Sequence, residues 1–119
     1  MPHYIAVHRF KSEDARKEYC MPPEKRTPPG KTETKKQWAI NVDGLTETVK
    51  CRQQWVGDDI AFCHWEAPSE EELLETFNRF GPKDLLTIEL HEQWRFVSFY
   101  NQTDEPLNIK NIDEQIAPK

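Results

Sequence analysis

The 119-residue sequence contains no long apolar run, and a membrane-spanning helix needs about 18 such residues. Its first ten residues also lack the basic and apolar segments of a signal peptide, so we expect a cytoplasmic protein without a membrane partner. Only four glycines are present, and they are widely separated. This spacing excludes the glycine-rich loops that hold nucleotide phosphates, so nucleotide-dependent chemistry is not expected.

Cysteine and positive charge are also scarce. The three cysteines, Cys20, Cys51 and Cys63, are odd in number and form no Cys-x-x-Cys pair, which predicts reduced thiols rather than a disulfide framework or a zinc knuckle. Lys and Arg number 16 against 21 Asp and Glu, a formal net charge of −5. The chain therefore lacks the basic surface on which nucleic-acid binding depends, and we expect no nucleic-acid partner.

What the sequence does have is aromatic residues, with 4 Trp, 6 Phe and 3 Tyr. Disordered chains lack such residues, so a folded core is expected despite a mean hydropathy of −0.88. The length suits one domain, predicted over residues 1–100 with a proline-rich insertion at 21–31 and followed by a polar tail at 101–119. The core proper is roughly 65 residues, a size that is marginal alone and therefore favours a homodimer.

Side-chain alternation predicts four strands, over residues 3–10, 49–56, 60–67 and 85–94. The middle two are joined by Gly57-Asp58-Asp59, whose residue types suit a tight hairpin. The aromatic stretch 95–100 either extends the last strand or adds an edge strand.

Helix signals occupy the intervals between these strands. Ser69 with Glu72 three residues later predicts a helix start, and Gly81 predicts a left-handed stop. A shorter helix from Ser12 is limited by the prolines that follow it. Residues 32–43 fit either a helix or a strand, and we favour a helix.

This order of elements predicts an α+β, ferredoxin-like βαββαβ fold. Its four-stranded antiparallel sheet, in the order 4-1-3-2, carries helices on one face only. The other face must be covered by a dimer partner, by the tail or by a ligand. At such a dimer contact we expect Trp55 and the pair Trp94 and Phe96.

Alternation divides each strand between the two faces. We expect the helices to cover Ile5, Val7, Leu86, Ile88 and Leu90. The open face then receives Tyr4, Ala6, His8, Phe10, Thr87, Glu89 and His91. For the strand at 60–67, parity alone leaves either Phe62, His64 and Glu66 or Ala61, Cys63 and Trp65 on the open face. We favour the first set, which places Ala6 level with His64 and Glu89, and Tyr4 level with Glu66 and His91.

Two imidazoles and two carboxylates would then converge above the small Ala6. The predicted metal ligands are His64, Glu66, Glu89 and His91, with His8 as a weaker candidate. Imidazole nitrogen and carboxylate oxygen suit a divalent ion such as nickel or zinc. The same residues would alternatively line a solvated dimer cleft or a pocket for a small organic ligand.

No catalytic residue is predicted. Cys63 is adjacent to His64, but neighbouring strand residues point to opposite faces, so this imidazole does not activate that thiol. The alternative to a binding protein is an enzyme that uses His64 or His91 as a general base on a small organic substrate.

Residues 58–71 carry an Asp-Asp turn, an aromatic-Cys strand and an Ala-Pro-acidic helix start. In these features the chain resembles a small bacterial ferredoxin-like family of unknown function that includes a nickel-binding protein. The likeness covers residues 46–90 and, more loosely, the first strand, and it departs at 21–31 and beyond Trp94. Dimeric stress-responsive α/β barrels and small monooxygenase-like proteins share the fold. The resemblance implies a homodimer and transition-metal binding, with no established reaction.

Overall fold

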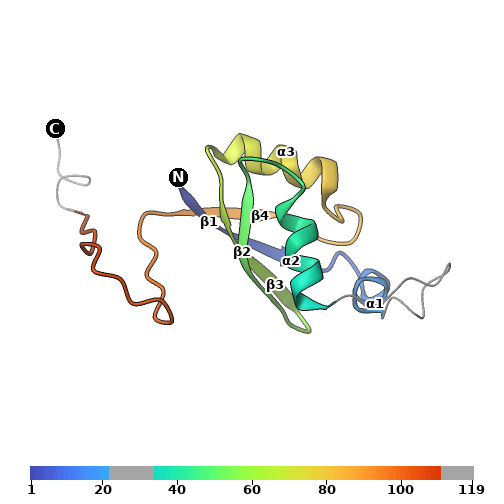
Figure 1. Ribbon diagram of the computed structural model, residues 1–119. Coiled ribbons are helices and arrows are strands. Elements are labelled where there is room, and N and C mark those ends of the chain that lie inside the picture. The colour runs from blue at the N-terminus through green and yellow to red at the C-terminus, as the bar shows by residue number, and fades with distance from the viewer. Residues whose placement is uncertain (22–33, 111–119) are drawn as a thin grey trace, which may run out of the picture.

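The computed structural model describes residues 1–21 and 34–110. These residues form β1 (His3–Arg9), α1 (Glu13–Cys20), α2 (Lys35–Asp43), β2 (Lys50–Val56), β3 (Ile60–Glu66), α3 (Glu70–Phe80) and β4 (Glu89–Gln93). Neighbouring strands are antiparallel, and the strand order is β2-β3-β1-β4 (Figure 1). The chain is thus an α+β protein with the predicted four-stranded antiparallel sheet, which is open and does not close into a barrel.

The core lies between the sheet and two helices. Val42 of α2 and Leu73 and Phe77 of α3 pack against buried residues of the sheet. Trp65 of β3 meets the ring of Phe77 edge-on, with the centroids 5.2 Å apart. We call this side of the sheet the helix face and the other side the open face. None of the described helices has the length and apolar character needed to cross a membrane.

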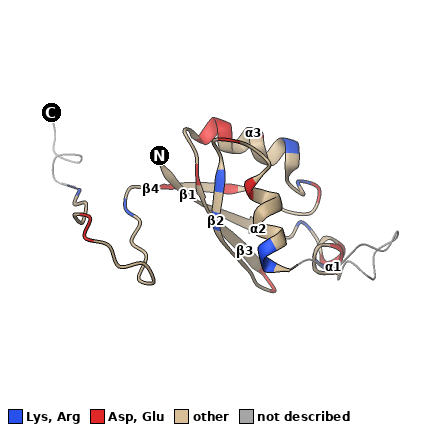
Figure 2. Cartoon of the chain, in the orientation of Figure 1, with Lys and Arg blue, Asp and Glu red and all other residues tan. Residues whose placement is uncertain are grey.

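The start of α3 follows the predicted cap. The Ser69 hydroxyl accepts a hydrogen bond from the Glu72 amide at 3.2 Å, which satisfies one of the free donors of the first turn. Acidic residues occupy this end of the helix, and Arg79 lies in the last turn (Figure 2). This arrangement of charges is favourable with respect to the helix dipole. The segment favoured as a helix at 32–43 is confirmed as α2, capped by Thr34.

Gly81 ends α3, although not in the left-handed conformation that the sequence predicted. Its φ of −82° and ψ of 159° are extended values that any residue adopts. A Cβ atom at this position would lie 2.8 Å from the carbonyl oxygen of Phe77. Glycine is therefore required by the close approach of the backbone to Phe77 rather than by an unusual φ.

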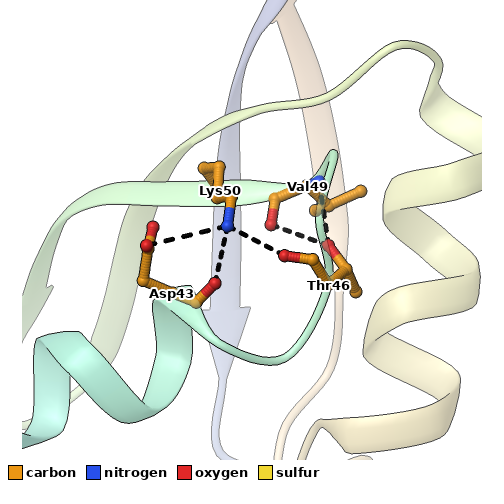
Figure 3. A network of polar contacts seen from close by, with 4 residues as sticks. All are labelled: Asp43, Thr46, Val49 and Lys50. Atoms are coloured by element: carbon orange, nitrogen blue, oxygen red, sulfur yellow. Dashed lines mark hydrogen bonds and ion pairs between the residues drawn. The ribbon is translucent and has the colours of Figure 1, made fainter.

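Lys50 holds the loop between α2 and β2. Its Nζ donates to the carbonyl oxygens of Asp43 at 2.7 Å and Thr46 at 2.9 Å, and it lies 3.6 Å from the Asp43 carboxylate (Figure 3). The Thr46 hydroxyl donates to the Val49 carbonyl and accepts from the Val49 amide. One ammonium group thus satisfies backbone acceptors at the end of α2 and at the start of the turn into β2.

The side chains of β1 face the opposite way from the prediction. The buried positions are Tyr4, Ala6 and His8. Ile5 and Val7 are only partly buried and lie on the open face. The physical reason is space, because Ala6 and Leu73 are both fully buried in one cluster and a β-branched residue at position 6 would hold α3 away from the sheet.

The register of β1 is also shifted by one residue from the prediction. Ala6 pairs with Cys63 of β3 and Leu90 of β4 rather than with His64 and Glu89. Side chains at the same level of a sheet share a face. The favoured assignment of β3 is confirmed, since Ala61, Cys63 and Trp65 are buried on the helix face.

β4 is shorter than predicted. Leu86 forms only an isolated bridge with Phe10, and regular pairing begins at Glu89. Leu86 is buried, and Ile88 and Leu90 pack against the core, so the prediction that these three side chains face the helices is confirmed. Residues 95–100 neither extend the strand nor add an edge strand.

Residues 94–110 form no helix or strand; Phe96 still contacts the sheet, and the rest of the segment runs away from it (Figure 1). The radius of gyration is 17.2 Å, whereas about 13.5 Å is typical of a compact chain of this length. Apolar side chains along this segment are exposed, among them Phe99, Tyr100, Leu107 and Ile109. The proline-rich insertion predicted at 21–31 lies outside the described residues, except for Met21. Residues 111–119 also lie outside them.

Leu73→Ala should lower the free energy of unfolding by about 2–5 kcal/mol, because it removes a fully buried side chain from the cluster under α3. Leu74→Ala is the matched control, since Leu74 is its neighbour on the same helix and is exposed, and we expect a change below about 1 kcal/mol. Urea unfolding followed by circular dichroism measures both values. Equal losses for the two variants would contradict this account of the core.

Candidate functional site

The open face gathers polar and apolar side chains from three strands. β1 contributes His3, Ile5 and Val7, β3 contributes Phe62, His64 and Glu66, and β4 contributes Glu89, His91 and Gln93. Ile5 pairs with His64 on one side and with His91 on the other. The two histidines that the sequence predicted to act together are thus separated by the width of β1.

His64 instead forms a pair with His3. The Nδ1 atom of His3 lies 2.8 Å from the Nε2 atom of His64, so one of the two nitrogens carries the shared proton and donates it. The ring of Phe96 lies against both imidazoles, and its centroid is 4.5 Å from that of His64 and 5.3 Å from that of His3. We call these three residues the imidazole pair and its Phe96 cover.

Charged and amide groups adjoin the pair. Arg52 donates through Nε to Oε1 of Glu66 at 3.0 Å, and this hydrogen bond lowers the pKa of the Glu66 carboxyl. Glu66 pairs in register with His3, so a carboxylate stands beside the pair. Gln53 places its amide nitrogen 3.4 Å from Nδ1 of His64. Arg52 and Gln53 reach this position through an irregularity of β2, where the register shifts between Cys51 and Gln53.

Burial lowers the pKa of His64, and the neighbouring His3 lowers it further. The neutral imidazole is therefore the form of His64 present near pH 7, since an unperturbed histidine titrates at about 6.5. A neutral imidazole offers an unprotonated nitrogen as a base or as a metal ligand.

Glu89 and His91 form a separate pair on β4. Their side chains are 3.2 Å apart, and both are exposed at the edge of the sheet. His8 lies on the helix face, where its Nδ1 atom is 3.0 Å from the Thr87 carbonyl oxygen and its ring packs against Phe77. The structure therefore brings together His64 and Glu66 of the predicted ligand set, and it places His8 on the opposite face.

Across the described residues, no group of three or more His, Cys, Asp or Glu side chains has the geometry to hold a metal ion. The predicted placement of the ligands above Ala6 is wrong, because Ala6 is buried in the core cluster with Leu73 and Phe77 of α3. Sequence reasoning placed His3 on the opposite face from His64, and it expected Phe96 at a dimer contact rather than over the two imidazoles. His3 would have followed from the correct parity of β1, whereas Phe96 comes from a segment without regular structure and no periodicity could place it.

Comparisons with protein-family models, curated proteins and solved structures each found no match to this chain. The candidate site therefore stands on its geometry.

Phe96→Ala should raise the pKa of His64 toward about 6.5, because the variant removes the ring that covers the imidazole and admits water. The measurement is a pH titration of the histidine ring protons by NMR. Phe99→Ala is the control, since Phe99 lies in the same segment and is exposed. The same shift in both variants, or no shift with Phe96→Ala, would contradict a covering role.

Proposed function

We propose that this protein is a small homodimeric binding protein that takes a divalent transition-metal ion at the imidazole pair, His3 and His64. The observation that carries the proposal is the 2.8 Å separation of the two ring nitrogens. Nitrogens bound to one ion at about 2.0–2.1 Å lie roughly 2.9–3.4 Å apart for ligand angles between square-planar and tetrahedral. To bind one ion, both rings would turn so that each lone pair points at the ion instead of at the other nitrogen, and the ion would take the place of the shared proton.

The chemistry of the surroundings supports the same ligand. Imidazole suits nickel, zinc and copper, and a ligating histidine must give up its proton. The lowered pKa of His64 reduces that cost. The negative charge of Glu66 beside the pair favours a bound cation, although Arg52 shares that carboxylate. Water or groups from a second copy would complete the coordination shell.

Dimerisation is proposed through the open face, in the arrangement of a dimeric α/β barrel. The ring centroids of Trp55 and Phe62 lie 5.2 Å apart on this face with the rings tilted, and Trp55 is 46% exposed. Ile5 and Val7 add apolar surface that the described helices leave uncovered. The resemblance of residues 58–71 to a ferredoxin-like family with a nickel-binding member agrees with both parts of the proposal.

Isothermal titration of tag-free protein with nickel chloride should show binding that His64→Ala and His3→Ala each weaken at least tenfold. Each variant removes one of the two ligands, and a tenfold change corresponds to about 1.4 kcal/mol. His91→Ala is the matched control, because His91 lies on the same face but outside the pair. No heat with the wild-type protein, or an equal loss in His91→Ala, would refute the site.

The affinity for nickel should also weaken as the pH falls, since protons compete for the same nitrogens. Because the pKa of His64 is lowered in the folded protein, protonation of this ligand should change the nickel affinity little between pH 8 and pH 7. The affinity should fall once the pH passes below the folded pKa of His64. Titrations repeated across this range measure the effect. Affinity that rises on acidification would be inconsistent with imidazole ligation.

Size-exclusion chromatography with light scattering should give twice the 14.1 kDa mass of one chain. Trp55→Ala should weaken the dimer at least tenfold, because aromatic residues commonly anchor such interfaces. Trp38→Ala is a close control: Trp38 is also 46% exposed, but it belongs to α2 and bonds to Gln54. A monomer at every concentration, or equal weakening in both variants, would argue against an open-face dimer.

A further inference from the structure

The segment after β4 closes on itself, and we call residues 94–110 the C-terminal loop. At its base the side-chain amide of Asn108 donates to the Trp94 carbonyl at 2.8 Å, and Arg95 donates to the Asn108 carbonyl at 3.5 Å. The ammonium group of Lys110 lies 5.9 Å from the centroid of the Trp94 ring. Surface loops whose ends meet in this way are frequently functional.

The C-terminal loop encloses a hollow of about 400 Å³. Pockets that bind small molecules begin at about 300 Å³, so this volume is large enough to take a bulky side chain. Apolar and amide side chains both line the hollow, among them Phe96, Val97, Phe99, Leu107, Asn101 and Gln102.

Aromatic side chains of the C-terminal loop are turned to solvent. Tyr100 is fully exposed, and Phe99 is 83% exposed. An aromatic side chain buries about 150–250 Å² when it is covered, and contiguous exposed apolar surface marks a site of interaction. The loop therefore presents an apolar surface and a hollow that its own chain does not fill.

The open face carries an exposed aromatic residue that suits this hollow. Trp55 of β2 pairs in register with Phe62 of β3, and Phe62 pairs with Val7 of β1. These three residues form an apolar row across the open face. Phe96 lies over the imidazole pair, toward the other end of the strands, and leaves the row uncovered.

The hollow and Trp55 lie apart within one chain. The C-terminal loop leaves the sheet from β4, and β4 and β2 are the two edge strands, three strand spacings or about 14 Å apart. Along the strands, Trp55 is level with Glu89, about 13 Å from Gln93 at the end from which the loop departs. Beyond Phe96 the loop runs away from the sheet (Figure 1).

We propose that the hollow of the C-terminal loop receives Trp55 of a second copy of the chain, and that two copies exchange this contact about a two-fold axis. The inference rests on the open-face dimer proposed above and names the anchor of that interface. In a two-fold interface each contact occurs twice, so both loops and both tryptophans are used. The side-chain oxygens of Asn101 and Gln102 offer acceptors for the indole N–H.

The available area favours a second copy as the occupant. A stable interface buries about 800 Å² on each partner. Trp55, Phe99 and Tyr100 supply most of this area at about 150–250 Å² each, and Val97 and Leu107 add to it.

Charge also permits contact between identical chains. The whole chain has a formal net charge of −5, which opposes self-association. The C-terminal loop instead contains two basic residues, Arg95 and Lys110, and two acidic residues, Asp104 and Glu105. It therefore has no net charge and adds no like-charge repulsion to the interface.

Leu107→Asp should weaken the dimer at least tenfold, because it sets an unpaired carboxylate against the indole in the hollow. Ile109→Asp is the matched control, since Ile109 belongs to the same loop, is 84% exposed and does not line the hollow. The same charge there should change the dissociation constant less than threefold. Sedimentation equilibrium measures both constants, and circular dichroism checks that both variants keep the wild-type fold.

The outcomes separate this inference from the open-face dimer itself. Equal dissociation constants for the two variants would overturn the inference, while a loss of affinity in Trp55→Ala would keep the dimer. A wild-type chain that is monomeric at every concentration would overturn both. Titration with nickel tests the metal site independently of either result.

Photochemical cross-linking identifies the chain that supplies the tryptophan. A benzophenone amino acid replaces Phe99 in one sample, which is mixed with wild-type chain labelled with a heavy nitrogen isotope and then irradiated. We expect adducts between the unlabelled loop peptide and the labelled β2 peptide that contains Trp55. The same group in place of Leu74, which is exposed on α3, is the control and should give no such adduct. Adducts confined to unlabelled peptides, or formed only outside β2, would contradict the exchange.

Discussion

The packing of α3 onto the helix face of β1 is the constraint on which the candidate site depends. The side chains of a strand alternate strictly between its two faces. Once Ala6 is buried on the helix face, the face on which each remaining β1 side chain lies is therefore fixed. His3 lies on the open face, where it meets His64, and His8 lies on the helix face, where its ring packs against Phe77. The packing of one helix on one strand therefore decides which histidine of β1 lies on each side of the sheet.

Much of the fold could be predicted because its signals are local. The cap at Ser69, the hairpin at Gly57 and the strand order all follow from residues close in sequence or from a common pattern of elements. The face and register of β1 could not be obtained in this way, because both alternate sets of side chains contain apolar residues. Ile5 is more hydrophobic than Ala6, but the space beneath α3 depends on residues from distant parts of the chain.

Of the candidate site, the sequence identified His64 and Glu66 correctly as neighbours on one face of β3. The partners of these residues were harder to predict. A one-residue shift of register changes every cross-strand neighbour. The residues predicted to converge above Ala6 therefore lie apart: His64 pairs with His3, His91 pairs with Glu89 at the edge of the sheet, and His8 is buried. The core also holds one unsatisfied donor that destabilises it, since Nε1 of Trp65 is buried without a hydrogen-bond partner among the described residues.

The two edges of the sheet determine whether a further strand can add to it. β2 is interrupted by its irregularity and carries Lys50 and Arg52, while β4 is only five residues long and carries Glu89 and Glu92. Charged side chains, short length and broken pairing all discourage the addition of a further strand. A sheet protected in this way resists edge-to-edge growth into fibres.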